Sequence, residues 1–170
     1  HDVNYVLALK EAEEKQSLPQ EIKIKYNIGV GNNPIFKEVF SRPSTAAKAS
    51  IAAIESIATK NAKRILNISG GTHHGRKSQA YGFCFLNDCV LSILKAIELG
   101  FKKILYVDID AHHCDGVQDV FSDNHKVDII SIHEKKRWPF TGLIEDCKIK
   151  NLLNFPVSED FTDVDMDFLI

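Results

Sequence analysis

Ionisable side chains gather in one short stretch, YVDIDAHHCDGV, between residues 106 and 117. Three aspartates, two histidines and a cysteine follow directly on an apolar run at 104–107. Charge at the edge of a protein core is costly unless it is paired or holds a metal ion. The stretch therefore predicts either a set of structural partners or a site of chemistry.

Histidines also occur directly after predicted strands elsewhere in the chain. Six of the seven fall between residues 73 and 133, and two adjacent pairs, 73–74 and 112–113, each follow a predicted strand. Ligands bind beyond the carboxyl ends of the strands in an open parallel sheet. One such pair is explained by ordinary loop packing, but two at neighbouring strand ends favour a functional site. His133 and Glu134, after a third predicted strand, are interpreted as loop residues and not as ligands.

The elements that must position these side chains alternate along the chain. Helices are predicted at 3–16, 44–60, 87–100 and 117–121, with Ser44 or Thr45 capping the second and Asn87 the third. Strands are predicted at 64–69, 103–110, 127–132 and 151–157, and a turn-rich loop at 27–34. Near-continuous apolar strands separated by helices predict the α/β class, with a parallel sheet flanked by helices on both faces.

Composition excludes several function classes. The 170 residues are 44% hydrophobic and 26% charged with a net charge of −2, which indicates one soluble globular domain and no direct nucleic-acid binding. The basic run at 135–137 is interpreted as a solvated loop. An apolar segment of about 18 residues is absent from the sequence, so no membrane span is predicted. The four cysteines show no disulfide or zinc-knuckle spacing, which favours the cytoplasm.

The spacing of Asp108, Asp110 and His112 suits metal binding. Alternate residues of a strand point to the same face at steps of about 6.6 Å, whereas a zinc ion holds its ligands at about 2.0–2.3 Å. Asp110 and His112, where the strand gives way to a loop, can reach one ion. Asp108 lies deeper and is suited to accept a hydrogen bond from a histidine ring. A third protein ligand is required, and these residues supply no convincing one.

Two motifs resemble a known family. GGTHHG…GFCFLND (70–88) and VDIDAHHCDGVQDVF (107–121) closely resemble the histone deacetylase family, which includes acetoin-utilisation-type and acetylpolyamine deacetylases on an arginase-like α/β fold. GNNPIF, SIHE and WPFTG follow in the expected order, so the resemblance spans nearly all of residues 29–157. It implies a single deacetylase-like catalytic domain over residues 1–170, incomplete at the C-terminus and also at the N-terminus.

The resemblance implies a zinc-dependent hydrolase that removes acetyl groups from acetylated lysine or acetylated amines. Asp110 and His112 would be two of three zinc ligands. Zinc polarises an amide carbonyl and lowers the pKa of bound water from 15.7 to about 7, while a histidine shuttles the proton.

The resemblance also implies catalytic roles for four further residues. His73 and His74 would be the paired histidines beside the metal-bound water, with His74 as general base and acid. Asp108 would orient His73, and Asp115 would orient His74.

Substrate contacts and a second ion follow from the same resemblance. Gly82 and Phe83 would line a narrow tunnel for the acyl-lysine chain, with Trp138 opposite and Asn32 at the rim. Two structural potassium sites are implied by two sets of residues: Asp108, Asp110, His112, Ser131 and Ile132 in the first, and Phe121, Asn124 and Val127 in the second.

Three positions depart from the family pattern. Cys114 and Phe140 stand where the family more often has glycine, and both are bulky enough to alter loop geometry. Asn32 stands where many members have an acid, so it lacks the charge that fixes the substrate backbone.

Two rival functions stay open. The DIDAH segment also resembles arginase-like ureohydrolases that hold two manganese ions, and the metal content per chain would separate the two enzyme types. A non-catalytic relative that binds acylated ligands is the other alternative.

The third zinc ligand and the oxyanion-stabilising tyrosine of the family come from loops later than residue 170. We therefore expect the 170-residue chain alone to show negligible turnover. Zinc-dependent release of acetate from an acetyl-lysine peptide by the purified segment would contradict this expectation.

Overall fold

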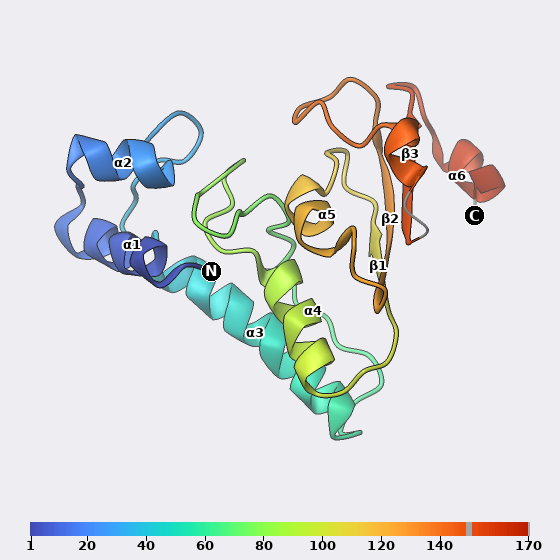
Figure 1. Cartoon of the computed structure of the whole chain (residues 1–170), viewed down its shortest axis with the longest axis horizontal. Helices are drawn as coiled ribbons and strands as arrows, with labels where there is room; N and C mark the ends of the chain where they lie inside the picture. Colours follow the sequence, from blue (N-terminus) through green and yellow to red (C-terminus); the bar gives the residue numbers. More distant parts are fainter. Residues whose placement is uncertain (149–150, 170) are drawn as a thin grey trace. The chain divides into compact units, whose positions relative to one another are not determined.

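The chain folds into two compact units, His1–Lys102 and Lys103–Ile170, in a computed structural model that describes residues 1–148 and 151–169. The first unit is helical and carries the 70–88 motif. The second contains a parallel sheet and carries the 107–121 motif (Figure 1). Each of the two sequence motifs is therefore positioned by its own unit.

Helices α1 (Val3–Lys15), α2 (Gln20–Tyr26), α3 (Ser41–Ala58) and α4 (Asp88–Glu98) form the first unit. Tyr5 and Leu9 of α1 are fully buried in a core that also contains Phe85 and Leu86 of the GFCFLND motif. The Tyr5 hydroxyl donates a hydrogen bond of 2.5 Å to the Phe85 carbonyl. The core thus fixes the segment that leads into α4.

Helix ends agree with the sequence where the cap is local. The helices predicted at 3–16 and 87–100 are confirmed as α1 and α4. The Asn87 side chain caps α4 by accepting from the Val90 N–H at 2.9 Å, and Gly100 follows with φ +88°. Helix α2 was not predicted from the sequence.

The predicted cap of the long helix is wrong. Helix α3 begins at Ser41, before Ser44 and Thr45, and it includes Pro43 in its first turn, where a missing N–H costs nothing. The Glu13 carboxylate of α1 instead accepts from the N–H groups of Phe40 and Ser41, at 2.9 and 2.8 Å. A distant side chain therefore supplies the cap.

The strand predicted at 64–69 is also wrong. This segment has no strand assignment, and its apolar side chains Leu66 and Ile68 are 84% and 88% exposed. A strand exists only when its backbone groups pair with a neighbour. Apolar composition alone does not supply that neighbour.

Strands β1 (Ile104–Asp108), β2 (Val127–Glu134) and β3 (Leu152–Val157) form a parallel sheet in the order β1-β2-β3. Helix α5 (Asp115–Phe121) follows β1, the 3₁₀ helix η1 (Ile144–Lys148) precedes β3, and α6 (Asp163–Leu169) ends the described chain. The parallel α/β sheet is confirmed. One correction concerns β2, which continues through His133 and Glu134, so these are strand residues and not loop residues.

The two faces of the sheet differ. On one face Val127, Ile129 and Leu152 are buried, as are Val117 and Phe121 of α5. On the other face, Leu105, Val107 and Leu153 are 61%, 52% and 47% exposed. The apolar pattern that predicts a sheet covered on both faces is present, but these three side chains remain open to solvent.

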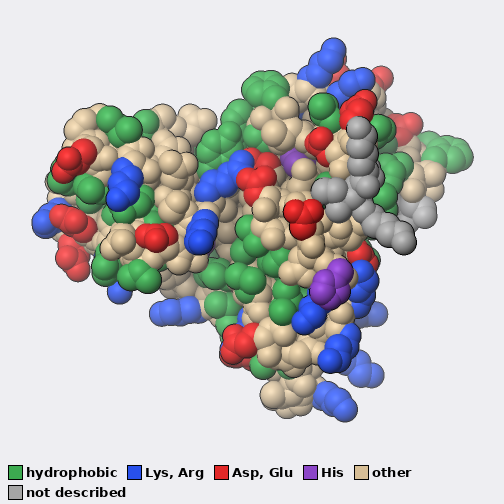
Figure 2. Space-filling view, viewed as in Figure 1, with side chains coloured by type: hydrophobic (Ala, Val, Ile, Leu, Met, Phe, Trp, Pro, Cys, Tyr) green, Lys and Arg blue, Asp and Glu red, His purple; other side chains and the backbone are tan. Residues whose placement is uncertain are grey.

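The surface carries charges of both signs, in keeping with the net charge of −2. Acidic and basic side chains are interspersed over α1 and α2 on the face shown in Figure 2. Across the described residues, none of the helices has the length and apolar character needed to cross a membrane.

Candidate active site

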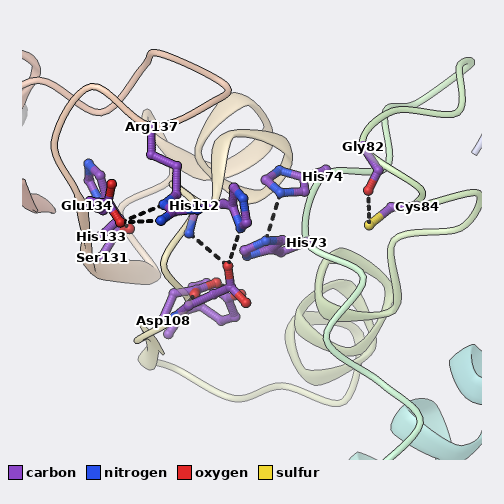
Figure 3. Close-up of polar contacts among 12 residues, drawn as sticks. His73, His74, Gly82, Cys84, Asp108, His112, Ser131, His133, Glu134 and Arg137 are labelled. Atoms are coloured by element: carbon purple, nitrogen blue, oxygen red, sulfur yellow. Dashed lines mark hydrogen bonds and ion pairs between the residues drawn. The ribbon is translucent and has the colours of Figure 1, made fainter. Parts of the chain in front are cut away.

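Two buried imidazoles lie on the loop between α3 and α4 in the first unit. The Nε2 atoms of His73 and His74 are 3.0 Å apart, and their ring centroids are 4.0 Å apart (Figure 3). Both residues are 5% exposed. At this distance one ring nitrogen donates and the other accepts, so the accepting nitrogen carries no proton. The geometry suits a pair of groups that exchange a proton.

Asn87 holds the histidine loop against α4. Its side-chain amide donates to the carbonyls of His73 and Gly75, both at 3.0 Å, while its oxygen caps the helix. Asn87 is 1% exposed, so these bonds are made by a buried side chain. The sequence predicts the cap, but it does not predict the two bonds to the loop.

Asp88 anchors the start of the same loop. Its carboxylate accepts from the N–H groups of Gly71 and Thr72 at 3.0 and 2.8 Å, and from the Ser50 hydroxyl at 2.6 Å. A Cβ atom at Gly70 would collide with the Asp88 carboxylate, which explains the glycine there. Asp88 was missed by the sequence analysis, although an acid at the start of a predicted helix, just after an apolar run, is a signal that could have found it.

A tight turn displays the predicted substrate residues of the first unit. Gly82 and Phe83 both have positive φ, +54° and +65°, inside a bridge between Tyr81 and Cys84, as in a type I′ turn. The Phe83 ring is 67% exposed. The Phe83 N–H donates to the Asn33 side chain at 3.0 Å, which brings the turn beside exposed Asn32. Asn33 is thus a positioning residue that the sequence analysis missed.

The two predicted zinc ligands lie together in the second unit. The Asp110 Oδ1 atom accepts from the His112 N–H at 2.8 Å and lies 2.9 Å from His112 Nδ1. Two ligands of one tetrahedral zinc ion are separated by about 3.3 Å at ordinary bond lengths. A small opening of this pair would therefore admit the ion. The described residues contain no cluster of three or more metal-binding side chains.

Asp108 lies at the end of β1 and shapes the loop that follows. Its carboxylate accepts from the Tyr106 hydroxyl at 2.5 Å and from the Asp110 N–H at 3.0 Å. The expected strand alternation ends here, because Asp110 and His112 lie in the loop beyond β1. The loop turn, and not a shared strand face, brings the two ligands together.

Residues of the first predicted potassium set are neighbours in the sheet. Asp108 and Ser131 are register partners, and Ile132 follows on β2. Of the departures from the family pattern, Cys114 has φ −77°, so no glycine is required there. Burial raises the pKa of the Cys114 thiol, which therefore stays protonated.

Two further histidines anchor the loop that carries Trp138. His113 Nε2 donates to the Gln118 side-chain oxygen, so its Nδ1 accepts from the Thr141 hydroxyl, both at 2.8 Å. His133 Nε2 donates to the Gly142 carbonyl at 3.0 Å. Burial lowers the pKa of both His113 and His133, which favours these neutral forms.

Gly142 is required between these rings. Its φ is +78°, and a Cβ there would lie 2.5 Å from His113 and 2.6 Å from His133. Trp138 meets the His112 ring edge-on with centroids 6.0 Å apart. Phe140, at φ +63° and 70% exposed, takes a backbone conformation that suits the glycine more usual in the family.

Several site predictions are not tested by the described contacts. The pairings of His73 with Asp108 and of His74 with Asp115 stay predictions. Asp115 is 2% exposed at the start of α5. The carbonyls of the second potassium set, Phe121, Asn124 and Val127, converge on the side chain of Asn151.

Asn87→Ala is expected to lower the free energy of unfolding by about 2–4 kcal/mol, because it removes the cap and leaves two carbonyls without donors. Asn87→Ser is expected to restore only the cap and to recover about 1 kcal/mol. Urea unfolding of the purified protein measures both. Equal stability of the two variants would show that the loop bonds, and not the cap, carry the whole effect.

Thr141→Val is expected to speed amide hydrogen exchange at Phe140 and Leu143 about fivefold, since the lost hydrogen bond to His113 is worth about 1 kcal/mol. Hydrogen exchange followed by mass spectrometry measures this. Thr162→Val is the matched control, because the Thr162 hydroxyl bonds locally to Asp165. Unchanged exchange in the 138–143 peptide would refute the anchoring role of His113.

Known proteins are similar to this chain in sequence and in fold. The chain is 36% identical over 144 residues to histone deacetylase 6 of Arabidopsis thaliana, covering 82% of this chain and 30% of that protein. It is 35% identical over 142 residues to acetoin utilization protein AcuC of Bacillus subtilis, covering 84% and 36%. A crystal structure of an HDAC homologue from Aquifex aeolicus matches at 36% identity and a TM-score of 0.92, covering 99% of this chain and 46% of that one.

The chain thus spans about a third of these curated relatives and less than half of the solved homologue. The histone deacetylase domain profile matches residues 1–170. Together with the paired histidines and the Asp110–His112 pair, this shows that the chain belongs to the histone deacetylase family.

Proposed function

We propose that the protein containing this chain is a zinc-dependent deacetylase that hydrolyses the amide of acetylated lysine or acetylated amines. The observation that carries the proposal is the Asp110–His112 pair, whose Oδ1 and Nδ1 atoms are 2.9 Å apart in a member of the histone deacetylase family. Aspartate oxygen and histidine nitrogen are ordinary zinc ligands. The third protein ligand is expected from later residues of the longer protein.

Bound zinc would supply a Lewis acid and an acidified water. The residues of the chain would then handle the protons. His74 would accept a proton at a ring nitrogen from the attacking water and return it to the departing amine. His73, whose Nε2 is 3.0 Å from that of His74, would share the charge of the protonated state. In the proposed mechanism, both histidines would act at the metal that Asp110 and His112 would hold.

The aromatic side chains support an acylated aliphatic substrate. Phe83 is 67% exposed on a tight turn, and Trp138 lies edge-on to His112. Apolar walls of this kind suit a neutral acetylated chain better than a hydrated ammonium group. A second solved HDAC homologue, 37% identical, is complexed with SAHA, which supports a ligand of this class.

A structural potassium ion at the set of Asp108, Asp110, His112, Ser131 and Ile132 belongs to the same proposal. So does a cytoplasmic location, which is supported by the absence of a disulfide among the described cysteines Cys84, Cys89 and Cys114.

The test uses the full-length protein with an acetyl-lysine peptide and an acetylated polyamine. Zinc-loaded enzyme is expected to release acetate, and chelation is expected to abolish release. Asp110→Ala and His74→Ala are each expected to lower kcat/KM at least about 100-fold. His125→Ala is the control, because His125 is exposed and belongs to neither cluster.

Metal analysis separates the alternatives. One zinc per chain is expected. Two manganese ions with no acetate release would instead indicate a ureohydrolase, and a metal-free protein that binds the peptide without hydrolysis would indicate a non-catalytic relative.

A further inference from the structure

Three backbone carbonyls of the second unit point at one side-chain nitrogen. Asn151 Nδ2 lies 3.2 Å from the Phe121 oxygen, 3.3 Å from the Asn124 oxygen and 2.7 Å from the Val127 oxygen. These carbonyls come from the end of α5, from the turn after it, and from the start of β2. Carbonyl oxygens from one short stretch of the sequence therefore surround a single point in space.

A ring of neutral carbonyl oxygens is the usual environment of a potassium ion. Here the same oxygens surround an amide NH₂ group, which carries two protons and a partial positive charge. Because all three neighbours are acceptors, the amide must present its nitrogen and not its oxygen to them. The nitrogen thus stands where a cation would have to lie.

Asn151 is held in this position by its backbone. Its carbonyl accepts from the Ile129 N–H at 2.8 Å, directly before β3 begins at Leu152. The carbonyls are also fixed, since Asn124 N–H bonds to the Phe121 oxygen and Val127 N–H bonds to the Asn124 oxygen, both at 2.9 Å. The amide therefore has little freedom to leave the carbonyl cluster.

We propose that the Asn151 amide replaces a potassium ion at the carbonyls of Phe121, Asn124 and Val127. The amide joins the α5–β2 turn to the start of β3 without a metal. The family resemblance implies an ion at these three residues, and the described contacts do not fit one. The first predicted potassium set is separate and is unaffected.

The test is the thermal stability of the full-length protein in potassium chloride and in choline chloride of equal ionic strength. Asn151→Ala leaves the three carbonyls without the amide, so its Tm in choline chloride is expected to fall by roughly 4 °C. Potassium chloride is expected to recover at least half of that loss, beyond any change seen in the wild type. Asn151→Asp, which faces the carbonyls with an anion, is expected to gain more from potassium than Asn151→Ala.

Asn154→Ala is the matched control. Asn154 is a buried asparagine of β3 whose amide donates to the Gln118 side chain at 3.0 Å, so its loss is expected to lower Tm equally in both salts. Crystals grown with thallium(I) give a second measurement. Anomalous density at the carbonyl cluster is expected in Asn151→Asp crystals and not in wild-type crystals.

Two results would overturn the proposal. One is thallium density among the three carbonyls of the wild type. The other is a potassium response of both Asn151 variants no larger than that of the wild type. Neither measurement uses catalysis, so the outcome is independent of whether the protein is a deacetylase.

Discussion

Buried polar groups must be hydrogen-bonded, and this constraint organises the histidine loop of the first unit. His73 and His74 are nearly inaccessible, yet they lie on a loop with no regular secondary structure. The N-cap residue and the first residue of α4 supply hydrogen-bond partners for the backbone of this loop. Asn87 donates to two loop carbonyls, and Asp88 accepts from two loop N–H groups. The motif is therefore a loop together with the helix start that holds it, which gives a physical reason for the ND dipeptide that ends GFCFLND.

In the second unit, buried imidazoles provide the hydrogen bonds that hold a loop in place. His113 and His133 are 2% and 3% exposed, and they bind the hydroxyl of Thr141 and the carbonyl of Gly142. The segment that carries Trp138 is thereby attached to β2 and to the loop after β1. His112, next to His113 in sequence, contacts Asp110 instead. One adjacent histidine has a structural role and the other a proposed metal-binding role, and their hydrogen-bond partners distinguish them.

The errors of the sequence analysis share a cause. Leu66 and Ile68 have the composition of a strand, but composition does not provide a pairing partner. Ser44 and Thr45 are good capping residues by type, but Glu13, 28 residues before Ser41, already satisfies the start of α3. Asn33 and Asn151 act through contacts with segments about 50 and 24–30 residues away. Local patterns carry no information about such partners.

The sequence by itself determined the family resemblance, the parallel α/β class, the Asn87 cap of α4 and the adjacency of Asp110 to His112. These features depend on residue type and on spacings of a few positions, which the printed letters contain. Only the tertiary structure decided which carbonyls Asn87 binds, where α3 begins, how the Trp138 loop is anchored and what fills the carbonyl cluster beside Asn151. The physical reason is that each of these depends on hydrogen bonds between segments far apart in the chain, and folding alone brings such segments together.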